Sequence, residues 1–421
     1  MCSTLPAEID VAIIGGGIIG ISTALTLARK GVRVAVFEKG TIAGEQSSRN
    51  WGWIRTVGRD PRELPLSAIA NEMWVDIQAR IDVGYRRTGL AYLAETDAEM
   101  ARHQAWLDSA KGTGTQGNLL GHNELAHLIP PSNRPWIGAL YSAGDGVAEP
   151  ALATAAIAML ATEAGATVFE QCAVRGLETS AGRTSAVITE RGLVKCASVV
   201  LAGGAWSRLF CGNNAVDFPQ LKVHASVLRT GPLETGLEIA INGSDFTCRK
   251  RSDGGYTVSQ LGASIADLTP DSIRLCRQFL PAWMAERKYL KLRVGRRFVE
   301  ELKIPRRFRL DAPTPFEACR TLDPPPTMKM VDGALGKLKH AFPAFRNATV
   351  AQAWAGFIDV TPDAVPVISE IHRIPGFFLA AGFSGHGFGI GPAAGALMAD
   401  LVMGETPRVD PKAFRLDRFS A

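Results

Sequence analysis

The stretch Asp10–Lys39, DVAIIGGGIIGISTALTLARKGVRVAVFEK, decides the fold. It begins with a short apolar run typical of a buried strand, which three consecutive glycines interrupt. Residues 18–30 have the length and composition of a helix, and Gly31 ends that helix as a C-cap. Residues 32–37 alternate as a second strand. The stretch therefore predicts a strand, a tight glycine turn, a helix and a second strand.

The three spaced glycines of this turn, Gly15, Gly17 and Gly20, each have a physical task. They permit the tight turn, the close approach of backbone to a pyrophosphate, and the close packing of helix on strand. The N-terminus of the helix then presents its N–H groups and positive dipole end to phosphates. Glu38 ends the second strand, where a carboxylate can accept ribose hydroxyls. The unit predicts a dinucleotide site, for NAD or FAD, and an acid at this position argues against NADP.

Size and composition are those of a packed enzyme. The chain has 421 residues, which predicts two or three domains. Apolar residues make up 46% and charged residues 21%, near the averages for globular proteins and far from disordered or fibrous classes. The net charge of +5 does not by itself indicate a nucleic-acid or membrane partner.

The cysteines favour a reducing compartment and argue against a metal site. They are odd in number, scattered and never spaced C-x-x-C: Cys2, Cys172, Cys196, Cys211, Cys248, Cys276 and Cys319. This pattern is typical of reduced, mostly buried thiols. We find neither a signal peptide nor a transmembrane helix. The expected location is cytoplasmic, with peripheral membrane contact left open.

Three further glycine-containing stretches suggest one long ligand that several segments contact. Residues 45–53, EQSSRNWGW, form a polar loop that could return toward the phosphates. Residues 198–207, SVVLAGGAWS, are a buried strand that ends in small residues, which allow close backbone approach. Residues 382–395, GFSGHGFGIGPAAG, are a glycine-rich loop that leads into a helix.

Together with Asp145-Gly146 to Pro150, Trp354-Ala355-Gly356 and Thr361-Pro362-Asp363, these stretches resemble a known superfamily over nearly the whole chain. It is that of the flavin-dependent amine and amino-acid oxidoreductases, which includes D-amino-acid, glycine and sarcosine oxidases. A narrower resemblance, to the bacterial L-amino-acid deaminases, is carried by residues 40–49, 172–179, 199–213 and 409–419. Those deaminases have an N-terminal membrane anchor, whereas a short polar lead precedes Asp10 here, so membrane tethering is not carried over.

The resemblance implies an α/β (mixed α+β) fold with a Rossmann-like FAD-binding domain. A discontinuous substrate domain would be built on a mixed, mostly antiparallel sheet. The implied FAD-binding domain comprises residues 1–90, 146–218 and 348–421, and the substrate domain residues 91–145 and 219–347.

The resemblance also implies a set of FAD-binding residues. Residues 356–360 contain no cysteine, where sarcosine oxidases attach flavin, so the FAD should be non-covalent. The implied contacts are Gly15, Gly17, Gly20, Glu38, Lys39, Gln46, Ser47, Ser48, Arg49, Val174, Gly203, Trp206, Gly356, Gly385, His386, Gly387, Phe388 and Gly389.

The resemblance implies oxidation of an α-amino acid to the imine and then to the 2-oxo acid plus ammonia, by hydride transfer from the α-carbon to flavin N5. Such chemistry needs no catalytic protein side chain, but it needs a cation for the carboxylate. Arg249 lies where the deaminases place that arginine, and Arg55 matches a sarcosine oxidase arginine more loosely. His386 and Trp53 are further expected substrate contacts. An oxidation of a secondary amine or N-substituted, opine-like amino acid is the alternative reaction.

A basic stretch, residues 274–309, contains twelve cationic side chains against three glutamates. Such a stretch is usually a solvated face. The alternatives are docking of an electron-acceptor protein or another acidic partner, an anionic membrane, or nucleic acid. Nucleic acid is the weaker alternative because no aromatic stacking platform accompanies the charges. The cationic residues are Arg274, Arg277, Arg287, Lys288, Lys291, Arg293, Arg296, Arg297, Lys303, Arg306, Arg307 and Arg309.

Overall fold

A computed structural model describes residues 4–262, 264–287 and 290–420. Cys2 and Lys288, two residues considered above, lie outside the described residues.

The N-terminal unit has the predicted order of elements. Strand β1 (Val11–Ile14) leads through the glycine turn to helix α1 (Ile18–Arg29), and strand β2 (Val34–Phe37) follows. Gly31 adopts a φ of +78° directly after the C-cap of the helix, a backbone conformation that favours glycine. All four residues of each strand are buried, as the apolar runs predict.

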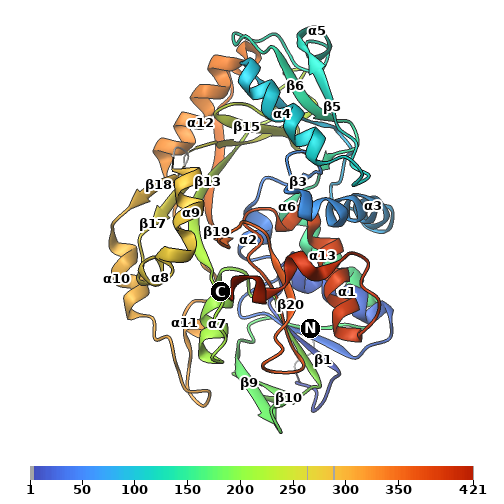
Figure 1. Cartoon of the computed structure of the whole chain (residues 1–421), viewed down its shortest axis with the longest axis vertical. Coiled ribbons are helices and arrows are strands. Elements are labelled where there is room, and N and C mark those ends of the chain that lie inside the picture. Colours follow the sequence, from blue (N-terminus) through green and yellow to red (C-terminus); the bar gives the residue numbers. More distant parts are fainter. Residues whose placement is uncertain (1–3, 263, 288–289, 421) are drawn as a thin grey trace.

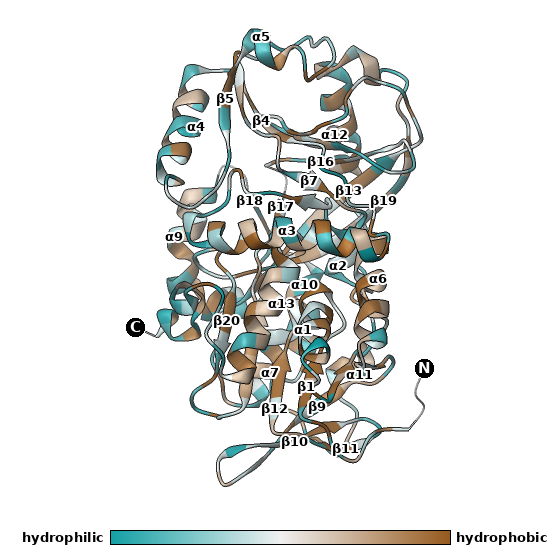
Figure 2. Ribbon diagram, turned by 90° about the vertical axis from the view of Figure 1, so that its right-hand side faces the viewer, coloured by the Kyte–Doolittle hydropathy of each residue, from teal (hydrophilic) through white to brown (hydrophobic). Residues whose placement is uncertain are grey.

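The unit belongs to a six-stranded sheet of order β20-β21-β12-β1-β2-β8. All neighbours are parallel except the pair β20–β21. Because the carboxyl ends of parallel strands meet at one edge, the loops after β1, β2, β12 and β21 lie together there. Figure 2 shows the strands of this sheet largely in the brown of hydrophobic residues. The further strands are β8 (Thr167–Phe169), β12 (Ser198–Leu201), β20 (Val367–Glu370) and β21 (Phe377–Ala381).

Helices cover this sheet, and α1 is packed between two of them. It contacts α6 (Pro150–Glu163) and α13 (Gly387–Met403), and α13 also contacts α3 (Leu64–Arg80). A Cβ on Gly395 of α13 would lie 2.6 Å from the Ser22 backbone of α1, so glycine permits this close helix contact. The other side of the sheet faces a three-stranded sheet of β9 (Val174–Ser180), β10 (Arg183–Thr189) and β11 (Gly192–Lys195).

A second, ten-stranded sheet forms the upper part of Figure 1. It is mixed and mostly antiparallel, with parallel pairs only at β17–β18 and β14–β4 among its printed pairings. Helix α12 (Met328–Ala341) packs on it through an apolar face, and α4 (Asp97–Ser109) contacts β5 and β6. The strands are β4 (Leu90–Ala94), β5 (Asn118–Gly121), β6 (Gly138–Ser142), β13 (Leu221–Thr230), β14 (Ala240–Asn242), β15 (Phe246–Lys250), β16 (Tyr256–Gln260), β17 (Ser264–Asp267), β18 (Leu290–Arg293) and β19 (Val350–Val360).

The predicted fold class is confirmed: the chain is mixed α/β, with a Rossmann-like sheet and a mostly antiparallel sheet.

Strand β19 contributes both to the ten-stranded sheet and to the cavity at the edge of the six-stranded sheet. The predicted division assigns residues 348–421 to the FAD-binding domain, but β19 pairs along its length with β13 of the ten-stranded sheet. Its residues 356–359 also line the cavity at the edge of the six-stranded sheet. The two predicted domains, which we retain as a proposal, are therefore joined along this strand.

The remaining elements are short. The basic stretch folds with its neighbours into α8 (Pro270–Arg274), α9 (Cys276–Glu286), β18 and α10 (Arg296–Lys303), drawn in gold beside β17 in Figure 1. No helix within the described part of the chain is both long and apolar enough to cross a bilayer. Other elements are α2 (Gln46–Arg49), β3 (Trp53–Ile54), β7 (Gly146–Val147), α5 (His122–Leu125), α7 (Ser207–Asn213), α11 (Pro315–Ala318) and short 3₁₀ helices at Pro61–Glu63, Gly204–Trp206, Pro343–Phe345, Pro411–Phe414 and Leu416–Phe419.

Candidate functional site

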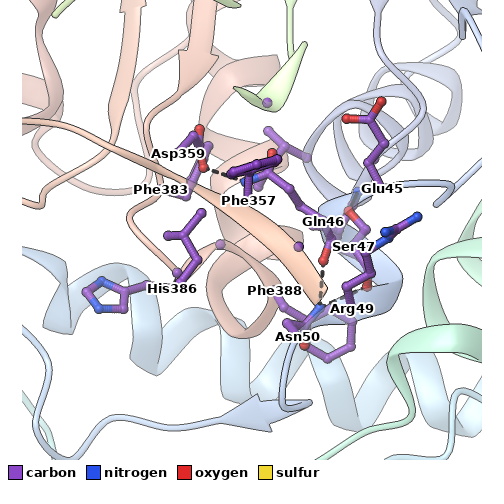
Figure 3. A pocket seen from close by; sticks show the side chains of 18 of the residues that line it. Glu45, Gln46, Ser47, Arg49, Asn50, Phe357, Asp359, Phe383, His386 and Phe388 are labelled. Atoms are coloured by element: carbon purple, nitrogen blue, oxygen red, sulfur yellow. Dashed lines mark hydrogen bonds between the residues drawn. The ribbon is translucent and has the colours of Figure 1, made fainter. Parts of the chain in front are cut away.

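A cavity of about 500 Å³ opens at the carboxyl edge of the six-stranded sheet. The loops after β1, β2, β12 and β21 line one part of it, and strands β13, β16 and β19 line another. The loops that sequence analysis assigned to one long ligand therefore converge at a single site. Figure 3 shows side chains of this lining from the loop at residues 45–50, from β19 and from the loop before α13.

The glycine turn after β1 leaves no room for side chains. Gly15 has a φ of +110°, and a Cβ there would lie 2.4 Å from the carbonyl oxygen of Ala202. A Cβ on Gly20 would lie 2.1 Å from the carbonyl oxygen of Gly15. Gly17 lines the cavity at the N-terminus of α1, where the Ser47 hydroxyl accepts a hydrogen bond from the Ile18 N–H at 2.9 Å. The turn thus brings bare backbone to the cavity wall, as the binding of a pyrophosphate requires.

Glu38 ends β2 at the cavity wall. Its carboxylate accepts hydrogen bonds from the Gly16 and Gly40 N–H groups, each at 2.7 Å. Burial raises the pKa of Glu38 above its usual range, and these two hydrogen bonds oppose that shift. An acceptor oxygen at this place matches the predicted ribose contact.

The loop that carries α2 is fixed to the rest of the wall through Gln46. The Gln46 amide donates to an Asp359 carboxylate oxygen at 2.8 Å and accepts from the Ala205 N–H at 3.0 Å. Figure 3 shows the Gln46 to Asp359 contact as a dashed line. The other Asp359 oxygen accepts from Gly382 N–H at 2.7 Å. Both carboxylate oxygens of Asp359 therefore accept hydrogen bonds. Through them Asp359 connects β19 with the loop at Gln46 and with the loop at Gly382.

Most cationic side chains of the cavity wall have a carboxylate partner. Arg55 is the exception among the described lysines and arginines of this wall. It donates a hydrogen bond to the Val57 carbonyl at 2.5 Å. The paired cations are Lys39 with Glu45, Arg49 with Asp323, Arg59 with Glu63, and Arg320 with Glu190.

Arg55 stands beside an aromatic wall. Its guanidinium carbon lies 5.6 Å from the ring centre of Tyr92 and 6.0 Å from that of Trp53. The Asp145 carboxylate holds the following residues, because it accepts hydrogen bonds from the Thr56 N–H at 2.9 Å and the Val57 N–H at 3.1 Å. The D-G element of the sequence thereby positions the backbone next to Arg55.

A buried polar group borders Arg55 at the start of α13. His386 Nδ1 lies 3.5 Å from a Glu63 carboxylate oxygen, and Arg59 Nη1 lies 3.7 Å from the other. Burial and the charge of Arg55 lower the pKa of Arg59 to about 10. Burial, followed by the charge of Arg59, also lowers the pKa of His386. Burial and the neighbouring Arg59 charge therefore favour the neutral imidazole over the charged one.

Comparison with known proteins identifies the family. The profile of the DAO family, described as FAD dependent oxidoreductase, matches residues 10–401. The chain belongs to this family. The FAD-dependent oxidoreductase is 27% identical to a glycine oxidase of Geobacillus kaustophilus, over 97% of each chain.

Solved structures support the narrower resemblance. The L-amino acid deaminase from Proteus vulgaris matches with a TM-score of 0.95 and 31% identity, over 100% of this chain and 99% of that one. The L-amino acid deaminase from Proteus myxofaciens, solved in complex with anthranilate, matches with a TM-score of 0.96 and 32% identity, over 99% of this chain and 95% of that one. The FAD-dependent oxidoreductase therefore shares its whole fold with these deaminases.

The cavity fits FAD, the cofactor of the family. Bare glycine backbone lies where a pyrophosphate would be held, and Glu38 lies where a ribose would be bound. No cysteine of the described residues lines the cavity, in agreement with non-covalent binding.

Most of the predicted contact residues line this cavity in the FAD-dependent oxidoreductase. Of the predicted cofactor contacts, Gly20 and Ser48 are not part of the wall. Gly20 packs on the Gly15 backbone, and the Ser48 hydroxyl donates to the Glu45 carbonyl at 3.2 Å. The predicted residues on the wall are Gly15, Gly17, Glu38, Lys39, Gln46, Ser47, Arg49, Trp53, Arg55, Val174, Gly203, Trp206, Gly356, Gly385, His386, Gly387, Phe388 and Gly389.

Arg249 is placed differently from its prediction. It does not line the cavity, only 1% of its side chain is exposed, and its guanidinium is paired with Glu149 at 2.8 Å. Its Nε donates to the Trp51 carbonyl at 2.5 Å. A guanidinium with these partners has no free edge for a substrate carboxylate. The structure therefore favours a structural role for Arg249.

Gly389 packs closely against the start of β3. A Cβ there would lie 2.7 Å from the Trp53 carbonyl oxygen. A side chain at this place would require the backbone of β3 to shift.

Several wall residues that no sequence motif indicated come from the ten-stranded sheet and α12. They include Tyr92, Ser226, Asn242, Gln260 and Met330. The sequence contained one signal for Tyr92. A half-buried tyrosine within the otherwise apolar strand LAYLA indicates a polar contact at its hydroxyl end. The others belong to no motif.

Proposed function

We propose that this FAD-dependent oxidoreductase oxidises a free α-amino acid to the imino acid, which adds water and releases ammonia to give the 2-oxo acid. The observation that carries the proposal is Arg55. It is a guanidinium on the cavity wall without a carboxylate partner among the described residues. Two structures that share the whole fold bear the name L-amino acid deaminase.

Arg55 is proposed to bind the substrate carboxylate through its two-pronged guanidinium, which matches a carboxylate in geometry. This contact would orient the α-carbon within the cavity, and orientation supplies a large part of the rate acceleration in reactions of this kind. Bound FAD supplies the acceptor, at N5, for the hydride that leaves the α-carbon. The amine must be uncharged when the hydride leaves.

The aromatic wall beside Arg55 is proposed to enclose the substrate side chain. The ring centres of Trp51 and Trp53 are 5.0 Å apart, and those of Trp53 and Tyr92 are 6.4 Å apart. Such a wall excludes water, which strengthens the ion pair between Arg55 and a carboxylate. It also favours amino acids with apolar or aromatic side chains.

The basic stretch is proposed to be the face at which electrons leave the protein, toward a membrane surface or an acceptor. Seven of its side chains are large, apolar and exposed: Leu280, Trp283, Met284, Leu292, Val294, Val299 and Leu302. Several of its cations are already paired, as in Arg293 with Asp267 and Arg297 with Glu301. This mixture favours a lipid-like partner over nucleic acid.

Anaerobic mixing with a panel of amino acids tests the proposed reaction. Bleaching of the flavin absorbance by primary α-amino acids, with formation of ammonia and 2-oxo acid, is the expected result. Bleaching by N-alkyl amino acids alone would contradict it. D and L isomers in the panel report the chirality, and the aromatic wall predicts faster bleaching by phenylalanine or leucine than by glycine.

A further inference from the structure

The ten-stranded sheet supplies a row of side chains to the wall of the cavity. Asn242 of β14 pairs in register with Tyr92 of β4 and with Thr247 of β15. Thr247 in turn pairs with Ser259 of β16. Residues that pair directly across neighbouring strands project on the same face of a sheet. Tyr92, Asn242 and Ser259 line the cavity, so this face of the sheet is turned toward it.

The serine hydroxyls of this part of the wall are bonded to the protein backbone. The Ser259 hydroxyl donates to the Ser226 carbonyl at 3.0 Å. The Ser226 hydroxyl accepts a hydrogen bond from the Thr327 N–H at 2.9 Å, directly before α12. The two serines therefore hold the wall together.

The amide of Asn242 has no such bonds. The side chain is half-buried and has no hydrogen-bond partner among the described residues, and its Oδ1 atom is buried. An amide that stays unpaired after a substrate has excluded water is unfavourable, because proteins satisfy nearly all of their buried polar groups. Asn242 therefore needs a polar partner from the molecule that fills the cavity.

This amide can present either of its two ends to a ligand. Because no hydrogen bond fixes it, it can turn about its last single bond, whose preferred angles are broad. It then offers either the Nδ2 donors or the Oδ1 acceptor. A phenolic hydroxyl suits both arrangements, since it donates and accepts. A charged group suits neither, because a neutral amide does not offset the cost of burying a charge.

Asn242 lies within reach of a substrate that Arg55 holds. Its register neighbour Tyr92 is about 4.8 Å away across the strands β4 and β14. The guanidinium carbon of Arg55 lies 5.6 Å from the ring centre of the same Tyr92. Asn242 and Arg55 are therefore both neighbours of one tyrosine. A substrate with one aromatic ring between its carboxylate and its hydroxyl matches this spacing.

The amide of Gln260, also on the cavity wall, is placed differently. Its Oε1 atom lies so close to α12 that a Cβ on Gly333 would be 2.7 Å away. Gln260 thus packs against α12, and it provides a matched control for Asn242.

We propose that Asn242 determines the specificity for the substrate side chain, because its amide binds a hydroxyl at the far end of an aromatic ring. Tyrosine-like amino acids are then preferred over phenylalanine. A site that binds a hydroxyl discriminates against the analogue that lacks it, since its own polar group is left unpaired. The proposal rests on the proposed function for the reaction and on Arg55 for the placement of the carboxylate.

Three substrates separate the hydrogen bond from the effect of size. Tyrosine carries the hydroxyl, phenylalanine lacks it, and 4-methylphenylalanine replaces it with a group of similar size that forms no hydrogen bond. Anaerobic bleaching of the flavin in the holoenzyme, over a range of concentrations, gives kcat/KM for each. The value for tyrosine should exceed the other two about tenfold, equivalent to about 1.4 kcal/mol.

Asn242→Leu removes the amide and keeps the approximate size of the side chain. It should make the three substrates nearly equal, chiefly by lowering kcat/KM for tyrosine. Gln260→Leu should keep the preference of the wild type. The visible spectrum of bound flavin should be unchanged in both variants, which shows that the cofactor site is intact.

Binding of unreactive acids tests the contact without turnover. The acids 3-(4-hydroxyphenyl)propanoate and 3-phenylpropanoate have no amine to be oxidised. Titration of the oxidised holoenzyme with each acid, followed through the flavin spectrum, gives their dissociation constants. The hydroxylated acid should bind about tenfold more tightly in the wild type, and the two should bind equally in Asn242→Leu.

The outcomes separate this proposal from the proposed function. If no amino acid bleaches the flavin, but the wild type prefers the hydroxylated acid and Asn242→Leu does not, the proposed function is wrong and the side-chain site stands. If primary amino acids bleach the flavin with the same preference in the wild type and in Asn242→Leu, the proposed function stands and the role of Asn242 is overturned. Loss of the preference in Gln260→Leu alone would also overturn it, as would failure of the wild type to bind either acid.

Discussion

Arg249 and Glu149 form a buried, two-pronged ion pair between the ten-stranded sheet and the start of helix α6. Nη1 donates to one carboxylate oxygen at 2.8 Å and Nη2 to the other at 3.1 Å. Arg249 lies on β15 of the ten-stranded sheet, and Glu149 is the N-cap residue of α6, which packs on α1. Burial raises the pKa of Glu149, but the hydrogen bonds and charge of Arg249, together with the Ser252 N–H and the charge of Arg251, outweigh burial, so the net pKa lies below its usual range. The pair thus stays ionised and ties the two parts of the fold together.

Arg249→Met is expected to lower the free energy of unfolding by about 3 to 5 kcal/mol, because Glu149 is left charged and buried without its main partner. Urea denaturation of the holoenzyme measures this loss. The double variant Arg249→Met, Glu149→Gln should recover part of it. A wild-type stability combined with a sharply raised KM would instead restore Arg249 as the carboxylate-binding residue.

Arg55→Met is expected to raise the KM for amino acids about 10- to 100-fold, since a hydrogen-bonded contact to a charged group contributes about 1.5 to 3 kcal/mol. The spectrum of bound flavin should stay unchanged. Anaerobic bleaching rates over a range of substrate concentrations measure the effect. Arg102→Met, on the exposed face of α4, is the control, and an unchanged KM in Arg55→Met would contradict the assignment.

Gly15→Ala is expected to lose most of its bound FAD. The φ of +110° disfavours alanine by about 1 kcal/mol or more, and the added Cβ would press against the Ala202 carbonyl oxygen at 2.4 Å. The ratio of flavin to protein after purification measures occupancy. Gly212→Ala, whose Cβ would meet no atom within 4 Å, should keep full occupancy. Equal occupancy in both variants would argue against the glycine turn as the pyrophosphate site.

His386 is expected to contribute to a loss of stability at acid pH. Burial lowers its pKa below the usual 6.5 in the folded protein, so the unfolded chain binds a proton more readily. Stability from this residue is therefore full above about pH 6.5 and falls as the pH drops toward the folded pKa. Unfolding free energies near pH 7.5 and near pH 5.5 should differ less in His386→Asn than in the wild type.

The exposed His372 provides the comparison for this pH effect. His372→Asn should keep the wild-type difference between the two pH values. If His386→Asn keeps it as well, the acid sensitivity arises at other residues.

The sequence predicted correctly those parts of the fold that depend on a few neighbouring residues. The turn at Gly15 and the acid Glu38 follow directly from the amino-acid order, because the steric freedom of glycine and the alternation of an apolar strand act over a few residues. The sequence also predicted that the loop around Gln46 returns toward the site, and Gln46 lines the cavity. Its hydrogen bond to Asp359, more than three hundred positions away, could not be predicted.

The substrate side of the site was less predictable. Tyr92, Ser226 and Met330 reach the cavity from strands and a helix without a motif. Their approach depends on how β13 pairs with β19 and how α12 packs on the sheet, which are contacts between distant segments.

The amino-acid sequence by itself determined the class of cofactor and the frame that holds it, since the glycine turn, the flanking strands and the terminal acid are set by neighbouring residues. Only the tertiary structure decided which candidate arginine lines the cavity without a carboxylate partner among the described residues. Arg249 and Arg55 have the same side chain. Arg249 is buried against Glu149, whereas Arg55 faces the cavity beside Trp53. The physical reason is that the availability of a charge depends on its partners, and folding brings those partners from remote parts of the chain.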